Sequence, residues 1–139
     1  MTDYIDLLQG AQDAVFAALK PIELDAGLPD GLGVYQHVPE NTQPPIVMIG
    51  QIGSESQDEH GDQVELITLE LQYVFRGPSR APLLAMMHAG RRALDNQDIA
   101  AAGIAFERPR YQRQEAGDAL ADGVTYVGIQ YFEFTAEPA

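Results

Sequence analysis

Hydrophobic residues recur at three- and four-residue steps in two stretches of the chain, which predicts two amphipathic helices. The first stretch runs from about Asp3 to Lys20. Pro21 predicts its end, because the residue before a proline avoids helical dihedral angles. The second stretch runs from Ser79, which can cap a helix, to about Leu94. Each apolar stripe predicts that one side of its helix packs against a core.

Apolar and polar residues alternate most clearly over residues 64–75, which predicts a half-buried strand. Two shorter stretches, 34–38 and 46–52, predict strands before it. The second of these is apolar almost throughout and is expected to be buried on both faces. Two further strands are predicted over 104–114 and 124–137.

The last two predicted strands carry irregularities. Pro109 lies inside the 104–114 strand and cannot donate a hydrogen bond to a neighbouring strand, so we expect an edge strand or a bulge there. The apolar pattern of the 124–137 strand changes phase between Tyr131 and Phe132. A bulge would explain this change, and so would a sheet that is covered on both faces, one of them by a partner.

The predicted order of elements is α-β-β-β-α-β-β, which indicates an α+β fold with a largely antiparallel sheet. The length of 139 residues is typical of one domain, and residues 1–139 are expected to form a single one. No apolar stretch approaches the roughly 20 residues that a membrane-spanning helix needs. The chain also begins with acidic residues where a signal peptide would be basic.

Charge is abundant and unevenly placed along the chain. There are 21 acidic and 8 basic residues, a net charge of −13, which disfavours binding to free duplex DNA. Lys20 is the only base in residues 1–75, all seven arginines lie in 76–113, and residues 114–139 carry acids alone. This segregation favours head-to-tail contact between copies, although a solvated basic face on a monomer would explain it too.

Two groups of charged or polar residues are therefore candidates for subunit or tube contacts. The first consists of arginines in the basic segment: Arg76, Arg91, Arg92, Arg108, Arg110 and Arg113. The second lies in the polar segment 53–63, which is long for a loop between two strands and is expected to be mobile until a neighbour orders it. Its candidates are Ser54, Glu55, Asp58, Glu59, His60 and Asp62.

Residues suited to catalysis or metal binding are sparse. The chain has no cysteine, which excludes disulfides, thiolate nucleophiles and cysteine metal sites. No phosphate-binding loop, dinucleotide fingerprint or G-x-S-x-G motif occurs. The carboxylates around His60 could hold a divalent cation, but they lack the calcium-loop spacing, so a solvated loop is the favoured interpretation.

The other two histidines, His37 and His88, lack a partner in the sequence that would form a catalytic group. His37 is predicted to be half-buried in a strand and His88 to lie on the second helix, and both positions favour structural roles. We therefore expect no catalytic residue, no metal and no cofactor.

Several segments occur in an order that resembles a known family. Residues 34–39 read VYQHVP and are soon followed by PIVMI at 45–49. The 64–75 strand is followed by Arg-Gly and by a helix that ends in Arg-Ala-Leu, and the chain closes with YFEFTAEPA over 131–139. In order and spacing, these segments resemble the tail terminator, or tail completion, proteins of tailed bacteriophages and gene transfer agents.

The resemblance implies a structural virion protein rather than an enzyme. It implies a homo-oligomeric, hexameric ring on the head-proximal end of the tail tube, with the tail tube protein and the head connector or stopper protein as partners. The ring would end tube polymerisation and let DNA pass through its lumen unread, with no membrane involved.

The resemblance places the protein at the tail–head junction of a virion or phage-like particle that is assembled in the bacterial cytoplasm. The alternative is a dimeric α+β domain that binds a small ligand or regulates, which would need an enclosed apolar pocket.

Overall fold

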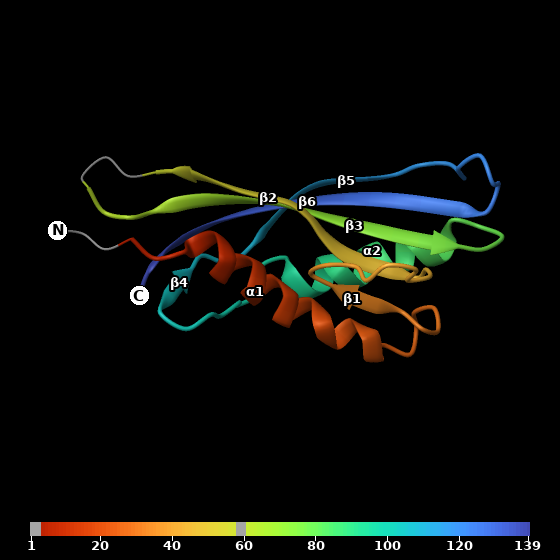
Figure 1. Ribbon diagram of the computed structural model, residues 1–139, viewed down its shortest axis with the longest axis horizontal. Helices are drawn as coiled ribbons and strands as arrows, with labels where there is room; N and C mark the ends of the chain where they lie inside the picture. The colour runs from red at the N-terminus through yellow and green to blue at the C-terminus, as the bar shows by residue number, and fades with distance from the viewer. Residues whose placement is uncertain (1–3, 58–60) are drawn as a thin grey trace.

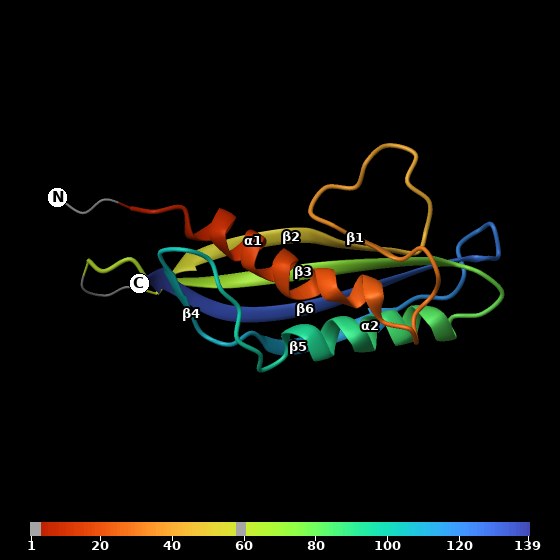
Figure 2. The same cartoon turned by 90° about the horizontal axis from the view of Figure 1, so that it is seen from below.

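The structure, a computed structural model, describes residues 4–57 and 61–139. Within these ranges, two α-helices lie on one side of a six-stranded sheet (Figures 1 and 2). The order of elements confirms the predicted α+β arrangement. In chain order they are α1 (Leu7–Leu19), the 3-10 helix η1 (Lys20–Leu24), β1 (Gly33–Tyr35), β2 (Ile46–Ser56), β3 (Glu65–Arg76), α2 (Ala81–Leu94), β4 (Ile104–Phe106), β5 (Arg110–Ala116) and β6 (Thr125–Pro138).

The sheet is largely antiparallel, as predicted. β3 lies in its middle and pairs with β2 on one side and with β6 on the other, both antiparallel. The far side of β6 pairs with β5 and, near its end, with β4. β1 is the exception, because it runs parallel to the first residues of β2. The sheet curls, and β1 and β4 lie toward the helix side in Figure 1.

The core lies between the sheet and the two helices. Alternate residues of β3 and β6, among them Leu69, Leu71, Phe132 and Phe134, are buried against the apolar stripes of α1 and α2. Burial of apolar surface on this face is the main favourable term for the fold, at roughly 25 cal/mol per Å².

One polar network crosses the core and connects α2 with the sheet. The Tyr73 hydroxyl donates to Gln130 Oε1 (2.6 Å), and Gln130 Nε2 donates to the Met87 carbonyl (2.9 Å). Burial raises the pKa of Tyr73, which keeps the hydroxyl protonated as a donor. Gly90 leaves room for this hydroxyl, because a Cβ there would collide with it. The network satisfies the buried polar atoms that would otherwise cost stability.

Both helices begin later than predicted. α1 starts at Leu7, because the Asp6 side chain accepts a hydrogen bond from the Gln9 N–H (2.9 Å) and so caps the helix there. The predicted start, Asp3, lies outside the described residues. Ser79 is not the cap of α2, which follows Arg80 without any side-chain cap.

The predicted 104–114 strand is divided at Pro109 into β4 and β5. The expectation of an edge strand or a bulge is confirmed, since within the described residues β5 pairs with β6 alone and its register shifts between Tyr111 and Arg113. A bulge does not explain the phase change in β6, because β6 pairs with β3 from Thr125 to Ala136 without a register shift. Apolar residues instead occur on both faces of β6.

The predicted loop over 53–63 is wrong for its first four residues. β2 continues to Ser56 and pairs with the start of β3, so the connection between the two strands is shorter than expected. Asp58, Glu59 and His60 lie outside the described residues. In the parts of the chain that are described, no helix is long and apolar enough to cross a membrane.

Candidate assembly surface

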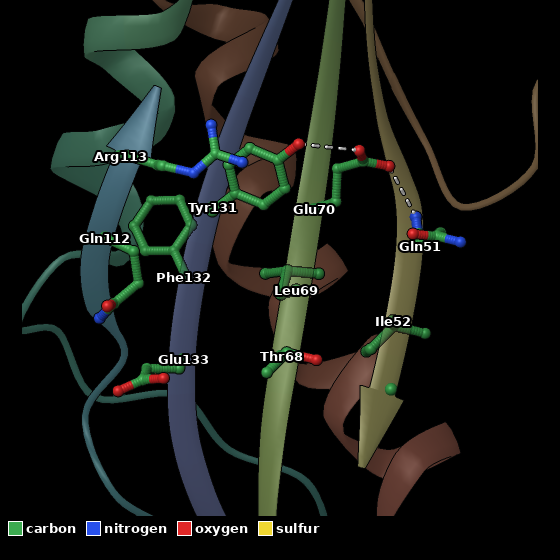
Figure 3. Close-up of a pocket in the computed structure, with 11 residues that line it drawn as sticks. Gln51, Ile52, Thr68, Leu69, Glu70, Gln112, Arg113, Tyr131, Phe132 and Glu133 are labelled. Atoms are coloured by element: carbon green, nitrogen blue, oxygen red, sulfur yellow. Dashed lines mark hydrogen bonds between the residues drawn. The ribbon is translucent and has the colours of Figure 1, made fainter. Parts of the chain in front are cut away.

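The face of the sheet opposite the helices carries no helix or strand over it in the described chain (Figure 1). We call it the open face. A row of four side chains crosses its centre: Arg113 on β5, Tyr131 on β6, Glu70 on β3 and Gln51 on β2 (Figure 3). The strand pairing creates this row, because Tyr131 pairs with Arg113 on one side and with Glu70 on the other.

The row carries a positive charge at its β5 end and a negative charge on β3, beside Gln51. The Arg113 guanidinium lies over the Tyr131 ring, 4.1 Å from its centroid, in a cation–π contact. The Tyr131 hydroxyl donates to Glu70 Oε1 (3.4 Å), and the Gln51 backbone N–H donates to Glu70 Oε2 (3.1 Å). No base of the described chain lies within 4.0 Å of the Glu70 carboxylate. A cation therefore marks the β5 end and a carboxylate without a cation marks the β2 side.

The row borders a surface hollow of about 490 Å³ on the open face. Thr68 and Glu133 continue its rim, while Leu69 and Phe132, which also line it, have side chains buried on the helix side of the sheet. The polar and charged side chains around the hollow suit contact with another protein surface.

Most of the predicted arginines form ion pairs within the chain. The pairs are Arg91–Asp95 (3.8 Å), Arg92–Asp25 (3.2 Å), Arg108–Asp98 (2.9 Å), Arg110–Glu107 (2.8 Å) and Arg113–Glu115 (3.7 Å). Arg76 differs, because its Nε donates to Thr125 Oγ1 (3.3 Å) and no carboxylate of the described chain lies within ion-pair distance.

The structure brings only part of the arginine group together. Arg108, Arg110 and Arg113 follow one another along and just before β5. Arg91 reaches β5 from α2 on the helix side of the sheet, where its guanidinium carbon lies 3.7 Å from the centre of the Tyr111 ring. Arg76 ends β3, where it pairs with the beginning of β6, and is not part of this cluster.

The described acidic candidates lie on or just after β2, at the edge of the sheet away from β5. Glu55 is exposed near the end of β2, and Asp62 is exposed in the turn that follows. Neither has a base of the described chain within 4.0 Å. Ser54 is also exposed on β2. Arg110 and Arg113 on β5 and Ser54 and Glu55 on β2 thus lie at opposite edges of one sheet.

The histidines do not gather with other chemical groups. The prediction of a half-buried strand position for His37 is wrong, because β1 ends at Tyr35 and His37 is exposed beyond it. His88 is on α2 as expected and is also exposed. In the described ranges, no three residues among His, Cys, Asp and Glu are grouped as metal ligands.

The sequence interpretation missed the central row itself. Glu70 and Gln72 stand at the outward positions of the alternating 64–75 stretch, so their polarity was a usable sign of a solvent-facing surface. Their alignment with Tyr131 and Arg113 depends on the register between strands, which alternation within one strand does not reveal.

A sequence profile of the family described as "Tail completion protein gp17" matches residues 13–137. The chain belongs to this tail completion family. It is thus a structural tail protein of a phage or phage-like particle, as the resemblance implied.

Among solved structures, the fold is similar to that of a chain from "Virion of native gene transfer agent (GTA) particle", with a TM-score of 0.75 and 14% sequence identity. The match covers 96% of this chain and 99% of that one, so the two share the fold over nearly their whole length. No curated protein matches this tail completion protein.

Proposed function

We propose that this tail completion protein forms a ring on the head-proximal end of the tail tube. The ring ends tube polymerisation, joins the tail to the head connector or stopper and leaves a lumen for DNA. The observation that carries the proposal is the family match over residues 13–137, which extends from the second half of α1 to the penultimate residue of β6. The proposed stoichiometry is six, and the partners are the tail tube protein and the connector.

The charge of the chain supports passage of DNA without binding. Six copies would carry six times −13, or −78. A ring with this charge would repel phosphate groups over much of its surface, and protein–DNA affinity at physiological salt depends largely on cations that neutralise phosphates. The DNA would slide through rather than adhere.

The distribution of charge supports contact between unlike surfaces of neighbouring copies. The arginines along β5 and the acids near the end of β2 lie on opposite edges of the sheet. A head-to-tail contact that joins different surfaces of each subunit closes into a ring when the rotation between copies allows it. Of the candidates, we propose that Arg108, Arg110 and Arg113, and not Arg92 on α2, meet the acids near the end of β2 across each subunit interface.

Mixing the purified protein with growing tail tubes tests this function. We expect elongation to stop and extra ring density to be visible by electron microscopy at one end of each tube. The double variant Arg108→Glu/Arg110→Glu should assemble more weakly and with greater salt sensitivity, whereas Arg92→Glu, on α2, should behave as the wild type does. Tubes that continue to grow, with no density at either end, would contradict the proposal.

The proposal assigns no catalytic step to the chain. His37 is the histidine that the sequence places within a predicted strand near the core, so it provides the sharpest test. We expect His37→Gln to assemble and to support DNA delivery at the wild-type level. A folded and assembling His37→Gln protein that fails in delivery would show that the imidazole has a chemical role.

A further inference from the structure

The sheet has two long open edges in the described chain. β1 covers only the first residues of β2, up to Met48, so no strand pairs with the outer side of residues 50–55. At the other end of the strand order, β5 pairs with β6 on one side only. The Tyr111 N–H at the start of β5 is occupied by Asp95 Oδ1 (3.1 Å), which leaves residues 112–116 as the accessible part of that edge. Open edges present backbone donors and acceptors for pairing with another chain.

The two edges match in length and in shape. Each spans five or six residues and each contains one bulge. In β2 the extra residue lies at Gly50 and Gln51, opposite Glu70. In β5 it is Gln112, beside Tyr131 and Phe132. Since Glu70 and Tyr131 are paired with each other, both bulges lie at the same level of the sheet.

The two edges also run in opposite directions. β2, β3, β6 and β5 are neighbours in space, and each successive pair is antiparallel. β5 is therefore antiparallel to β2 within one copy. A rotation about an axis roughly parallel to the strands would place β5 of one copy beside β2 of the next in an antiparallel arrangement, with the two bulges level.

The charges of the two edges are complementary. Arg113 stands at the β5 end of the central row, its side chain 62% exposed. Glu70 lies toward the β2 end, and no base among residues 4–57 and 61–139 lies within 4.0 Å of its carboxylate. When neighbouring copies lie at the same height along that rotation axis, Arg113 of one copy would reach Glu70 and Gln51 of the next. Arg110 would lie close to the neighbour's exposed Glu55. Arg110 pairs with Glu133, which shares a row with Thr68 and Gly53, and Glu55 follows Gly53 by two residues on the same strand.

We propose that β5 of one copy adds to the β2 edge of the next copy, so that the sheet continues from subunit to subunit. Arg113 then lies between the Tyr131 ring of its own chain and the Glu70 carboxylate of the neighbour. The inference rests on the proposed ring and specifies the surface through which its copies meet. The occupant of each edge is a second copy, since each edge is complementary to the other in charge, direction and bulge position.

The absence of cysteine from the chain allows a direct test by cross-linking. Two single variants, Ser54→Cys on β2 and Gln112→Cys on β5, place thiols on exposed positions of the two edges. Assemblies on tail tubes are formed from an equal mixture and treated with a short bis-maleimide. We expect a cross-linked dimer in the mixture, weak cross-linking in either variant alone, and none in a control mixture of Ser54→Cys with Leu24→Cys.

Charge exchange provides a second test on two exposed side chains. Arg113→Glu places an acid beside the neighbour's Glu70, and Gln51→Lys places a base beside the neighbour's Arg113. Each variant alone should lose most of the assembled fraction measured by sedimentation. An equal mixture of the two should recover it, because alternating copies again bring opposite charges together. Arg92→Glu provides a matched charge reversal away from both edges and should assemble normally.

The outcomes separate this inference from the proposed function. Rings that form on tubes without the edge-to-edge cross-link, or that tolerate both single charge variants, would overturn the strand pairing and leave the function standing. A protein that never assembles, alone or with tubes, would overturn both. Cross-linking in the mixture together with recovery on mixing would establish the β5–β2 contact.

Discussion

The two faces of the sheet are formed by the same strands, but one face is buried beneath the helices and the other is exposed. On the covered face, alternate residues of β3 and β6 such as Leu71 and Phe134 are fully buried beneath α1 and α2. On the open face, the intervening positions carry Glu70 and Tyr131, which remain partly exposed. Because successive residues of a strand point to opposite faces, one short sequence supplies both surfaces.

The buried residues of the covered face stabilise the folded chain, whereas the exposed residues of the open face are available for contacts with other subunits. Large buried side chains contribute several kcal/mol each when they fill a close-packed core. Exposed ion pairs contribute about 0–1 kcal/mol, since water screens them and their side chains lose entropy. Open-face residues can therefore change with little cost to the monomer, and their main effects are expected in the oligomer.

The largest expected effect is on the covered face. Phe134→Ala should lower the free energy of unfolding by about 3–5 kcal/mol, because it removes a fully buried ring and leaves a cavity. Denaturant unfolding followed by circular dichroism would measure the loss. Tyr131→Ala, three residues earlier in β6 and on the other face, is the comparison and should lose less than half as much. Equal losses would show that the two faces do not differ as described.

The next effect concerns the network between α2 and the sheet. Gly90→Ala should destabilise by about 1–3 kcal/mol, the usual cost of overpacking, because the new Cβ collides with the Tyr73 hydroxyl. Tyr73→Phe removes that hydroxyl and leaves Gln130 without its donor, at a cost of about 1–3 kcal/mol. The double variant should be less destabilised than the sum of the two, and strict additivity would count against the collision.

A smaller effect is expected at Glu23, which connects η1 with β1. Burial raises the pKa of this carboxyl, but the Lys20 ammonium (2.8 Å) and the Val34 N–H (2.8 Å) outweigh that, and the net pKa is lowered. A lowered folded-state pKa stabilises the protein above the unfolded-state value and loses this contribution as the pH falls through the folded-state value.

Glu23→Gln should therefore cost about 0.5–1.5 kcal/mol at neutral pH. The difference from the wild type should shrink at acidic pH, below the ordinary pKa of a glutamate. Unfolding measured over a series of pH values tests this, with Glu40→Gln, an exposed glutamate, as the control. A difference that stays constant into acid would rule out the carboxylate as its source.

The smallest effect on stability is expected at Glu70. Glu70→Gln keeps an oxygen that can accept from the Gln51 N–H, so the monomer should lose less than about 0.5 kcal/mol. The same variant removes the charge that Arg113 of a neighbour would meet, so the assembled fraction should fall. A variant with unchanged assembly and a large loss of monomer stability would reverse the distinction between the two faces.

The sequence alone determined the fold class, the order of elements and the family. Helical and strand periodicities are local, since each is set by which residues a single element can bury, and they located α1, α2 and β3 to within a few residues. Proline chemistry likewise identified the irregular strand around Pro109. The boundaries at Leu7 and Ser56 were missed, because a cap from Asp6 and pairing with the start of β3 depend on contacts that propensity does not contain.

Only the tertiary structure decided which polar residues lie together. The sequence singled out the arginines of residues 76–113, but the structure separates Arg76 from Arg113 and pairs most of them with acids of the same chain. It also aligned Gln51, Glu70 and Arg113 in one row, although 62 residues separate the first from the last. Register between strands created that row, because a shift of one residue would turn each of these side chains to the opposite face.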